Sequence, residues 1–181
     1  MGQYYRPVLQ QDGITTIYNR DIDGNYTMAK LTEHSWWNNS LMNAVSEKLY
    51  QKNGRLLWCG DYAEDDEIEM SKLTVRDIWD IDGEELSYTD FRIDGLFLCN
   101  HDTKEFIDLD KYKEISTDSD DWCLHPLSLL TAIGNGRGGG DYYYSNQEDI
   151  GIWAWNIISF ENTPPEEYKE FVVMFKEAIN G

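Results

Sequence analysis

Apolar residues recur along this chain at two different spacings, and the first spacing predicts a helix near residue 45. Four apolar residues follow the 3.6-residue period of one helix face. They are Leu41, Met42, Val45 and Leu49. The stripe is preceded by Asn38, Asn39 and Ser40, any of which can cap the first turn, and it is followed by Asn53 and Gly54, which can end the helix. We therefore predict an amphipathic helix over about residues 40–52.

The end of the chain carries a second pattern of helical type. Thr163 can cap a first turn that Pro164 opens. An apolar stripe follows, made of Tyr168, Phe171, Val172, Phe175 and Ile179. We expect a second amphipathic helix over about residues 164–179.

Short β-branched and aromatic runs predict strands. Runs 3–9 and 14–18 are separated by Gln-Gln-Asp-Gly, which predicts a hairpin, and Pro7 places the first strand at a sheet edge. Further strands are expected at 26–31, 55–59, 96–99 and 150–160, and a short helix around 74–80. Residues 106–115 could pair with 96–99, and 124–133 suit either strand or helix. The order predicts an α+β fold with a mostly antiparallel sheet.

Length and composition limit the possible classes. The 181 residues suit a single domain, 1–181, and 14% aromatic content argues against a disordered acidic tail. There is no apolar run of membrane-spanning length and no secretory signal pattern, so a cytoplasmic location without membrane contact is expected. The cysteines, Cys59, Cys99 and Cys123, indicate reduced thiols. No metal-ligand spacing is present, and no cofactor is expected.

The charge is extreme and unevenly distributed. The net charge is −19, and the acidic segment 61–121 carries 21 acids and 6 bases, a net of −15. Direct binding of nucleic acid is disfavoured, because like charges repel and no counterions would be released from phosphates. A basic surface is the expected partner.

The densest acidic run opens that segment. Its carboxylates are Asp61, Glu64, Asp65, Asp66, Glu67 and Glu69. Such a run is usually a solvated face or a disordered loop. Alternatively it presents an array resembling nucleic-acid phosphates, which carry one charge per about 1.7 Å of duplex axis. In that interpretation Trp79 and Tyr88 supply the aromatic anchoring that charge alone does not provide.

The glycine-rich loop 134–140 reads GNGRGGG and matches the dinucleotide pattern G-x-G-x-x-G by letter. That pattern needs a strand before it and a helix after it, whereas Asp141 and three tyrosines follow here. We interpret the segment as a mobile loop whose glycines permit positive φ. Alternatively, Arg137 and the tyrosines form a contact surface at this mobile loop.

Catalytic and metal alternatives are weaker. His34, Arg55, Asp61 and Asp65 contain the residue types of a hydrolytic site, but no spacing makes them specific. His34 before a helix and Asp61 after a strand suit a cap and a turn equally well. A calcium loop starting at Asn19 fails because Lys30 occupies its twelfth position. His125, which precedes Pro126, is expected to be structural.

Several sequence blocks carry a family resemblance. These are MGQYY, EHSWW, RLLWCGDYA and HPLSLLTAIGNGRGGGDYY. Over most of its length the chain resembles a family of small proteins from phages, plasmids and Firmicutes genomes. In size and acidity it is similar to the type II-A anti-CRISPR inhibitors. The resemblance implies a non-enzymatic inhibitor of a guide-RNA-loaded CRISPR–Cas nuclease in the bacterial host cytoplasm. Such nucleases offer a basic heteroduplex channel and arginines that read the PAM.

Overall fold

The first predicted helix is present where the sequence places it. The computed structural model describes residues 1–26 and 29–176, and α1 spans Ser40–Gln51. The Asn39 side chain caps it by accepting hydrogen bonds from the Leu41 and Met42 amides at 2.9 and 3.3 Å. The apolar stripe of α1 is buried in the main core.

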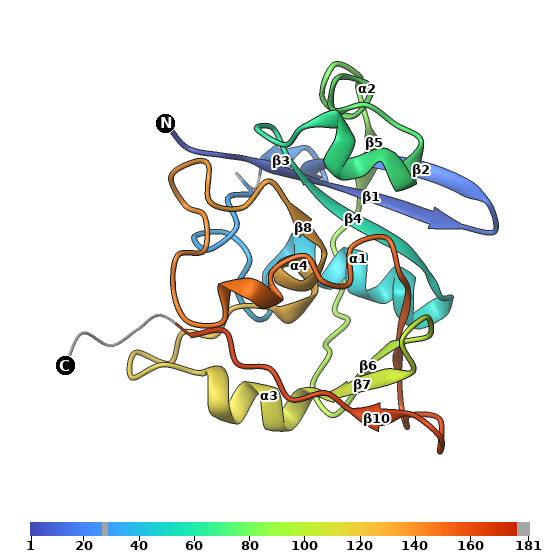
Figure 1. The fold of residues 1–181 in the computed structure, drawn as a ribbon, viewed down its shortest axis with the longest axis vertical. Coiled ribbons are helices and arrows are strands. Elements are labelled where there is room, and N and C mark those ends of the chain that lie inside the picture. The colour runs from blue at the N-terminus through green and yellow to red at the C-terminus, as the bar shows by residue number, and fades with distance from the viewer. Residues whose placement is uncertain (27–28, 177–181) are drawn as a thin grey trace.

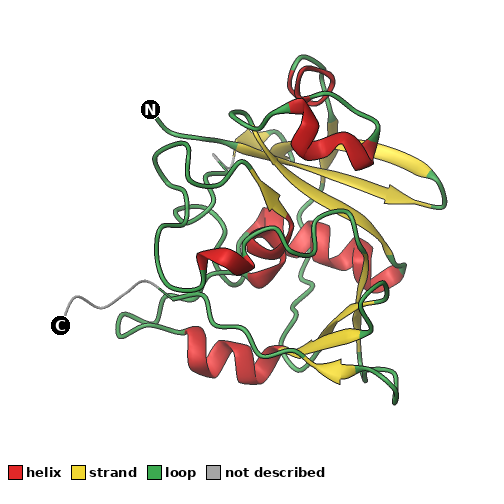
Figure 2. Cartoon of the chain, viewed as in Figure 1, coloured by secondary structure: helices red, strands yellow, loops and turns green. Residues whose placement is uncertain are grey.

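One mixed sheet links the upper and lower parts of the molecule, with α1 in the middle of the view (Figures 1 and 2). Its strands are β1 Tyr5–Gln11, β2 Ile14–Ile22, β3 Asn25–Tyr26, β4 Gly54–Gly60, β5 Glu84–Leu86, β6 Phe97–Asn100, β7 Glu105–Asp108, β8 Ala132–Ile133, β9 Ile157–Glu161 and β10 Lys169–Glu170. They follow the order β10-β7-β6-β9-β4-β1-β2-β3, with β5 beside β2 and β8 beside β4. The pairs β2–β5, β4–β8 and β7–β10 are parallel. The α+β class is therefore confirmed, but the sheet is mixed instead of mostly antiparallel.

The remaining helices are short. They are α2 Val75–Trp79, α3 Leu109–Ser116 and α4 Pro126–Thr131, with 3₁₀ turns η1 Asp65–Ser71 and η2 Gln147–Asp149. The short helix expected at 74–80 is confirmed as α2. The two segments whose structure the sequence left undecided each contain a helix and a strand. Residues 106–115 contain the end of β7 and most of α3, and residues 124–133 contain α4 followed by β8.

The C-terminal helix prediction is wrong over the residues that the structure describes. The expected helical segment contains instead β10, which pairs in parallel with β7 at Glu105 and Phe106. Val173 and Phe175 are buried whereas Val172 is 71% exposed, so the apolar residues follow the period of an extended segment. Residues 177–179 of the predicted helix lie outside the described part.

The hairpin is confirmed, but the edge position of its first strand is wrong. Asp12 and Gly13, both with positive φ, form the turn between β1 and β2. β1 lies between β4 and β2, yet it tolerates Pro7 because its ladder with β2 begins only at Val8. The missing N–H of Pro7 therefore leaves no gap in that ladder.

Two other predicted strands are shorter than expected. β3 ends at Tyr26, residues 27–28 are not described, and Ala29 has a φ of 55°, which breaks an extended chain. The segment 150–155 is a series of turns with left-handed backbone at Gly151 and Trp155, so β9 begins only at Ile157.

The sheet buries apolar residues on both faces. Along β4, Leu56 and Trp58 point into the main core, while Leu57 and Cys59 point into a smaller second core. The cysteines at 59, 99 and 123 are free thiols and are buried, as expected. No helix within residues 1–26 and 29–176 is long and apolar enough to cross a membrane.

Candidate functional site

The second core is covered by the most acidic part of the chain. We name residues 61–86 the acidic lobe; it contains η1, α2 and β5 and lies at the top of Figure 1. Ile68 and Ile78 of the lobe are fully buried against the sheet residues Val8 and Leu57. The lobe carries 11 acids and 2 bases, a net charge of −9. The buried Ile68 and Ile78 side chains fasten the lobe to the sheet, and most of its charged side chains lie at the surface.

The acidic segment 61–121 does not form one continuous surface. Residues 87–121 carry a net charge of −6 and lead into β6, β7 and α3 at the other end of the molecule (Figure 1). β5 pairs with β2, whereas β9, β4 and β1 separate β6 from β2 in the sheet order. The sequence-based boundary therefore encloses two acidic surfaces, of which the lobe is the denser.

The run 61–69 has the densest carboxylates of the lobe, and most of them are exposed. Glu64, Asp65, Asp66 and Glu69 are exposed, whereas Asp61 and Glu67 are partly buried. Some of these carboxylates also accept hydrogen bonds from backbone amides. The side chain of Asp65 accepts a hydrogen bond from the Val75 amide at 2.8 Å. Burial raises the pKa of Asp61, whose carboxylate accepts a hydrogen bond from the Tyr4 amide at 3.1 Å.

One group within this run has the donor set of a weak cation site. Ligand oxygens of Glu64, Asp66 and Glu67 lie within 4.8 Å of one another. Oxygen donors suit hard cations such as Ca²⁺. Exposed carboxylates commonly lie this close without a bound ion, so the cluster by itself assigns no metal.

Arg6 attaches the lobe to the sheet. It is only 5% exposed, and its Nη1 donates to the carbonyls of Ile78 and Ile81 at 2.6 and 3.0 Å, at the end of α2. Its Nη2 donates to Asn19 Oδ1 at 2.9 Å. Burial lowers the pKa of Arg6. Sequence analysis missed this role, for which the only signal was the position of Arg6 on the same strand face as Val8.

The two predicted aromatic anchors have different environments. Trp79 is partly buried on the second core, and the guanidinium carbons of Arg6 and Arg20 lie 5.6 and 5.3 Å from its ring centroid. Tyr88 is 57% exposed and donates through its hydroxyl to Asp90 at 3.2 Å. Tyr88 is therefore the more accessible of the two, whereas Trp79 packs between the lobe and the sheet.

The glycine-rich loop is held in place by a buried carboxylate. The amides of Gly136, Arg137 and Gly138 donate to Asp141 Oδ2 at 2.9, 2.9 and 3.1 Å. The side chain of Gln3 donates to the same oxygen at 2.7 Å, and Tyr5 donates to Oδ1 at 2.8 Å. The loop is thus anchored instead of freely mobile. Its amides already bind an internal anion, as a nest does.

Arg137 brings this loop to the edge of the lobe. Its guanidinium forms an ion pair with Glu67 and donates to the Tyr62 carbonyl at 2.8 Å. The structure therefore brings together the acidic run and Arg137, which the sequence separates by about 70 residues. In this conformation Arg137 reduces the negative charge at one edge.

The residues proposed for hydrolysis do not converge on one point. Arg55 and Asp61 lie at or beyond opposite ends of β4, about 20 Å apart at about 3.3 Å per residue. His34 Nδ1 accepts a hydrogen bond from the Lys30 amide at 3.0 Å, and burial lowers its pKa. Asp65 instead supports the start of α2.

His101 lies in a hydrogen-bonded chain that no motif in the sequence signals. Tyr168 Oη lies 2.8 Å from its Nδ1, and Ser159 Oγ lies 2.7 Å from its Nε2. Ser159 also donates to Glu161 at 2.7 Å. Because the hydroxyl proton of Ser159 points to Glu161, His101 acts as a donor to Ser159 and does not activate it as a nucleophile. Ser159 is 2% exposed, which further favours a structural role.

Comparison with protein-family models, with curated proteins and with solved structures finds no match for this chain. Residue roles therefore have to be argued from its own geometry and charge. The acidic lobe, which has the highest charge density, is therefore the candidate functional site. Tyr88 follows it by two residues, and Arg137 lies at its edge.

Proposed function

We propose that the protein is a non-enzymatic inhibitor that binds the basic nucleic-acid groove of a bacterial nuclease through its acidic lobe. One observation carries the proposal: a net charge of −9 is held on a lobe of 26 residues that Ile68 and Ile78 fasten to the sheet. A folded scaffold keeps the carboxylates at roughly fixed positions, which a disordered acidic tail does not do. Preorganised charge of this kind competes with phosphates for Lys and Arg side chains.

The proposed partner is a guide-RNA-loaded CRISPR–Cas nuclease in the cytoplasm of the bacterial host. This choice depends on the resemblance to mobile-element proteins and type II-A anti-CRISPR inhibitors. Such a nuclease has a positively charged heteroduplex channel and PAM-reading arginines, whose charge is opposite to that of the lobe and complements it. Occupying either one would block target recognition or cleavage.

Two alternatives remain distinct from this proposal. A hydrolase centred on His34 and Asp61 would lack its proposed companion Arg55, which lies near the end of β4 that is far from Asp61. An acidic regulatory protein would use the same lobe on another basic partner. Only the identity of the partner separates that alternative from a nuclease inhibitor.

The first test is a binding and cleavage assay with the guide-loaded nuclease at low and at physiological salt. The variant replaces three exposed lobe acids with lysine: Asp66→Lys, Glu69→Lys and Asp80→Lys. These positions avoid Asp65, which supports α2, and Glu67, which pairs with Arg137. Within the described part of the chain, only Asp80 of the three gives up an ion pair, the exposed one with Arg76. We expect the wild type to bind and inhibit, with weaker binding at higher salt, and the variant to lose at least tenfold in inhibition.

A matched control makes the same change of charge outside the lobe. Asp120→Lys, Glu166→Lys and Glu167→Lys reverse three exposed acids and should leave inhibition nearly unchanged. Equal losses in both variants would show that only net charge matters. Absence of wild-type binding at either salt concentration would reject the nuclease as partner and favour a regulatory role elsewhere.

A further inference from the structure

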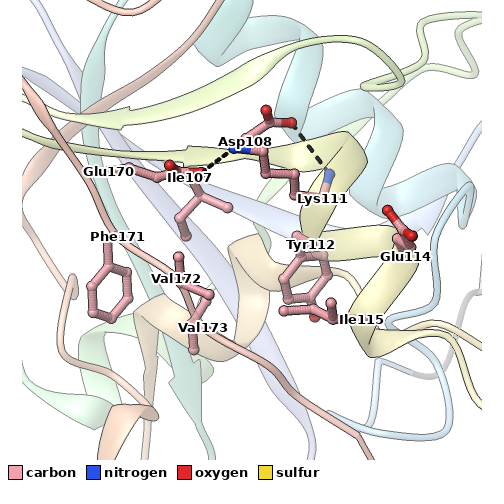
Figure 3. Close-up of a pocket in the computed structure, with 10 residues that line it drawn as sticks. All are labelled: Ile107, Asp108, Lys111, Tyr112, Glu114, Ile115, Glu170, Phe171, Val172 and Val173. Carbon is pink, nitrogen blue, oxygen red and sulfur yellow. Dashed lines mark hydrogen bonds and ion pairs between the residues drawn. The ribbon is translucent and has the colours of Figure 1, made fainter.

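A concave site lies at the end of the molecule opposite the acidic lobe. It is a pocket of about 250 Å³ between α3 and the extended segment that contains β10 (Figure 3). Tyr112 and Ile115 of α3 form one wall, and Phe171, Val172 and Val173 form the facing wall. Tyr112 and Val173 are buried, whereas Val172 is 71% exposed and Ile115 is 38% exposed. The pocket therefore combines a packed floor with open apolar sides.

The rim of this pocket is acidic. Asp108, Glu114 and Glu170 line it together with one base, Lys111, which gives a net charge of −2. Lys111 Nζ is already paired with Glu170 at 3.0 Å, and Asp108 caps α3 by accepting from the amides of Asp110 and Lys111. Glu114 is exposed beside the apolar walls. A ligand that entered the pocket would therefore meet negative charge at its edge.

The dimensions favour a side chain over a free metabolite. Typical small-molecule sites have volumes of roughly 300–1,000 Å³ and enclose most of their ligand. This pocket is smaller and open on one side, as are the sites that accept a single anchoring residue of a protein partner. Aromatic and large aliphatic side chains are the usual anchors in such sites.

A second copy of this chain is a poor occupant. Two molecules of net charge −19 repel each other, and the rim would place acid against acid. A partner segment with Lys or Arg beside an apolar residue would instead complement both the walls and the rim.

We propose that this pocket binds a basic polypeptide segment by accepting one large apolar side chain while flanking Lys or Arg residues contact the rim around Glu114. The site is separate from the acidic lobe and does not depend on the function proposed for it. It would give the protein a second, shape-dependent contact with a basic partner, at the opposite end from the lobe.

The test uses three fluorescein-labelled peptides, KRFRK, KRARK and EEFEE, in an anisotropy titration at physiological salt. We expect KRFRK to bind at least tenfold more tightly than KRARK, because only the phenylalanine fills the pocket. EEFEE should bind at least tenfold more weakly than KRFRK, because the acidic rim repels it. Val172→Lys and Glu114→Lys should each weaken KRFRK binding at least fivefold.

Two controls separate this site from general charge effects. Ile14→Lys alters a β-branched residue whose exposure, 70%, matches that of Val172, on the distant β1–β2 hairpin, and should retain KRFRK binding. The lobe variant with lysine at 66, 69 and 80 should retain the preference for KRFRK over KRARK. Equal binding of KRFRK and KRARK, or loss of the preference in the lobe variant alone, would overturn the pocket proposal. A wild-type dimer that Val172→Lys dissociates would also overturn it, by identifying a second copy as the occupant.

Discussion

At the scale of single residues, His125 is the clearest example of a titratable side chain that burial in the fold keeps uncharged. It is fully buried at the start of α4, where its Nδ1 accepts a hydrogen bond from the Leu127 amide at 3.2 Å. Its Nε2 lies 3.5 Å from Ser46 Oγ. Burial lowers the pKa of His125 to about 3, so the ring stays neutral at physiological pH. This confirms a structural role for a histidine whose position before Pro126 first suggested it.

The lowered pKa predicts a specific pH dependence of stability. An unfolded histidine titrates near pH 6.5, so between about pH 6.5 and 3 the unfolded state binds a proton that the folded state does not. The unfolding free energy should therefore fall as pH falls, with a contribution approaching about 1.4 kcal/mol per pH unit. Urea unfolding of the wild type and of His125→Asn between pH 7 and pH 4 measures this contribution.

Asparagine suits the comparison because it can cap a helix and does not titrate. The variant should lose stability less steeply with acid, whatever its stability at pH 7. Carboxylates titrate in both proteins, so the difference between the two curves isolates His125. Parallel curves would show that His125 does not cause the acid sensitivity.

At the scale of elements, local signals explain which predictions are confirmed. The Asn39 cap, the apolar stripe of α1 and the Asp12-Gly13 turn all act within a few residues, so the sequence pattern contains them. The segment after residue 164 fits either a helix or an extended strand by apolar spacing. β10 pairs with β7 more than 60 residues earlier, and a local pattern cannot contain that contact.

The same division applies to the candidate site. The acidic residues could be predicted because charge density is a local property of the sequence. Their attachment depends on long-range contacts from Arg6 to Ile78 and from Arg137 to Glu67. The separation of segment 61–121 into two surfaces likewise follows from sheet order.

Arg6 provides the element-scale prediction. Arg6→Met removes the side-chain donor to the Ile78 and Ile81 carbonyls at the end of α2, and unsatisfied buried groups cost roughly 1–3 kcal/mol each. We expect a loss of about 3 kcal/mol, partly offset by relaxation of the lobe toward solvent. Urea denaturation measures the loss, and hydrogen exchange should show faster exchange in η1 and α2 than in α1.

Arg76→Met is the matched control for this experiment. Arg76 also lies on α2 and pairs with Asp80 at 2.8 Å, but its side chain is 87% exposed. Exposed pairs of this kind contribute less than about 1 kcal/mol. Unchanged exchange of the α2 amides in Arg6→Met would contradict the anchoring role.

At the scale of the whole molecule, folding confines a net charge of −19 within one domain. Self-repulsion of this kind destabilises the compact state and favours keeping the protein monomeric. The fold offsets part of the repulsion by placing its two acidic surfaces at opposite ends, with Arg6 and Arg20 beneath the lobe. The largest remaining repulsion should lie within the lobe, where a net of −9 is carried by 26 residues.

This distribution predicts that salt stabilises the protein. It also predicts that the acidic lobe contributes more to the salt dependence of the melting temperature than an equal number of acids elsewhere. The melting temperature should rise between about 10 mM and 300 mM NaCl, as the screening length falls from about 30 Å to well below 10 Å. The two triple lysine variants share a net charge of −13, yet the lobe variant should show the higher melting temperature at low salt and the smaller response to salt. Calorimetry of the three proteins makes the comparison.

If the melting temperatures of both variants shift equally, the repulsion is a property of total charge, and the lobe holds no excess of electrostatic repulsion. If the lobe variant alone shifts, the wild-type protein keeps a repulsive charge cluster that a basic partner would relieve on binding.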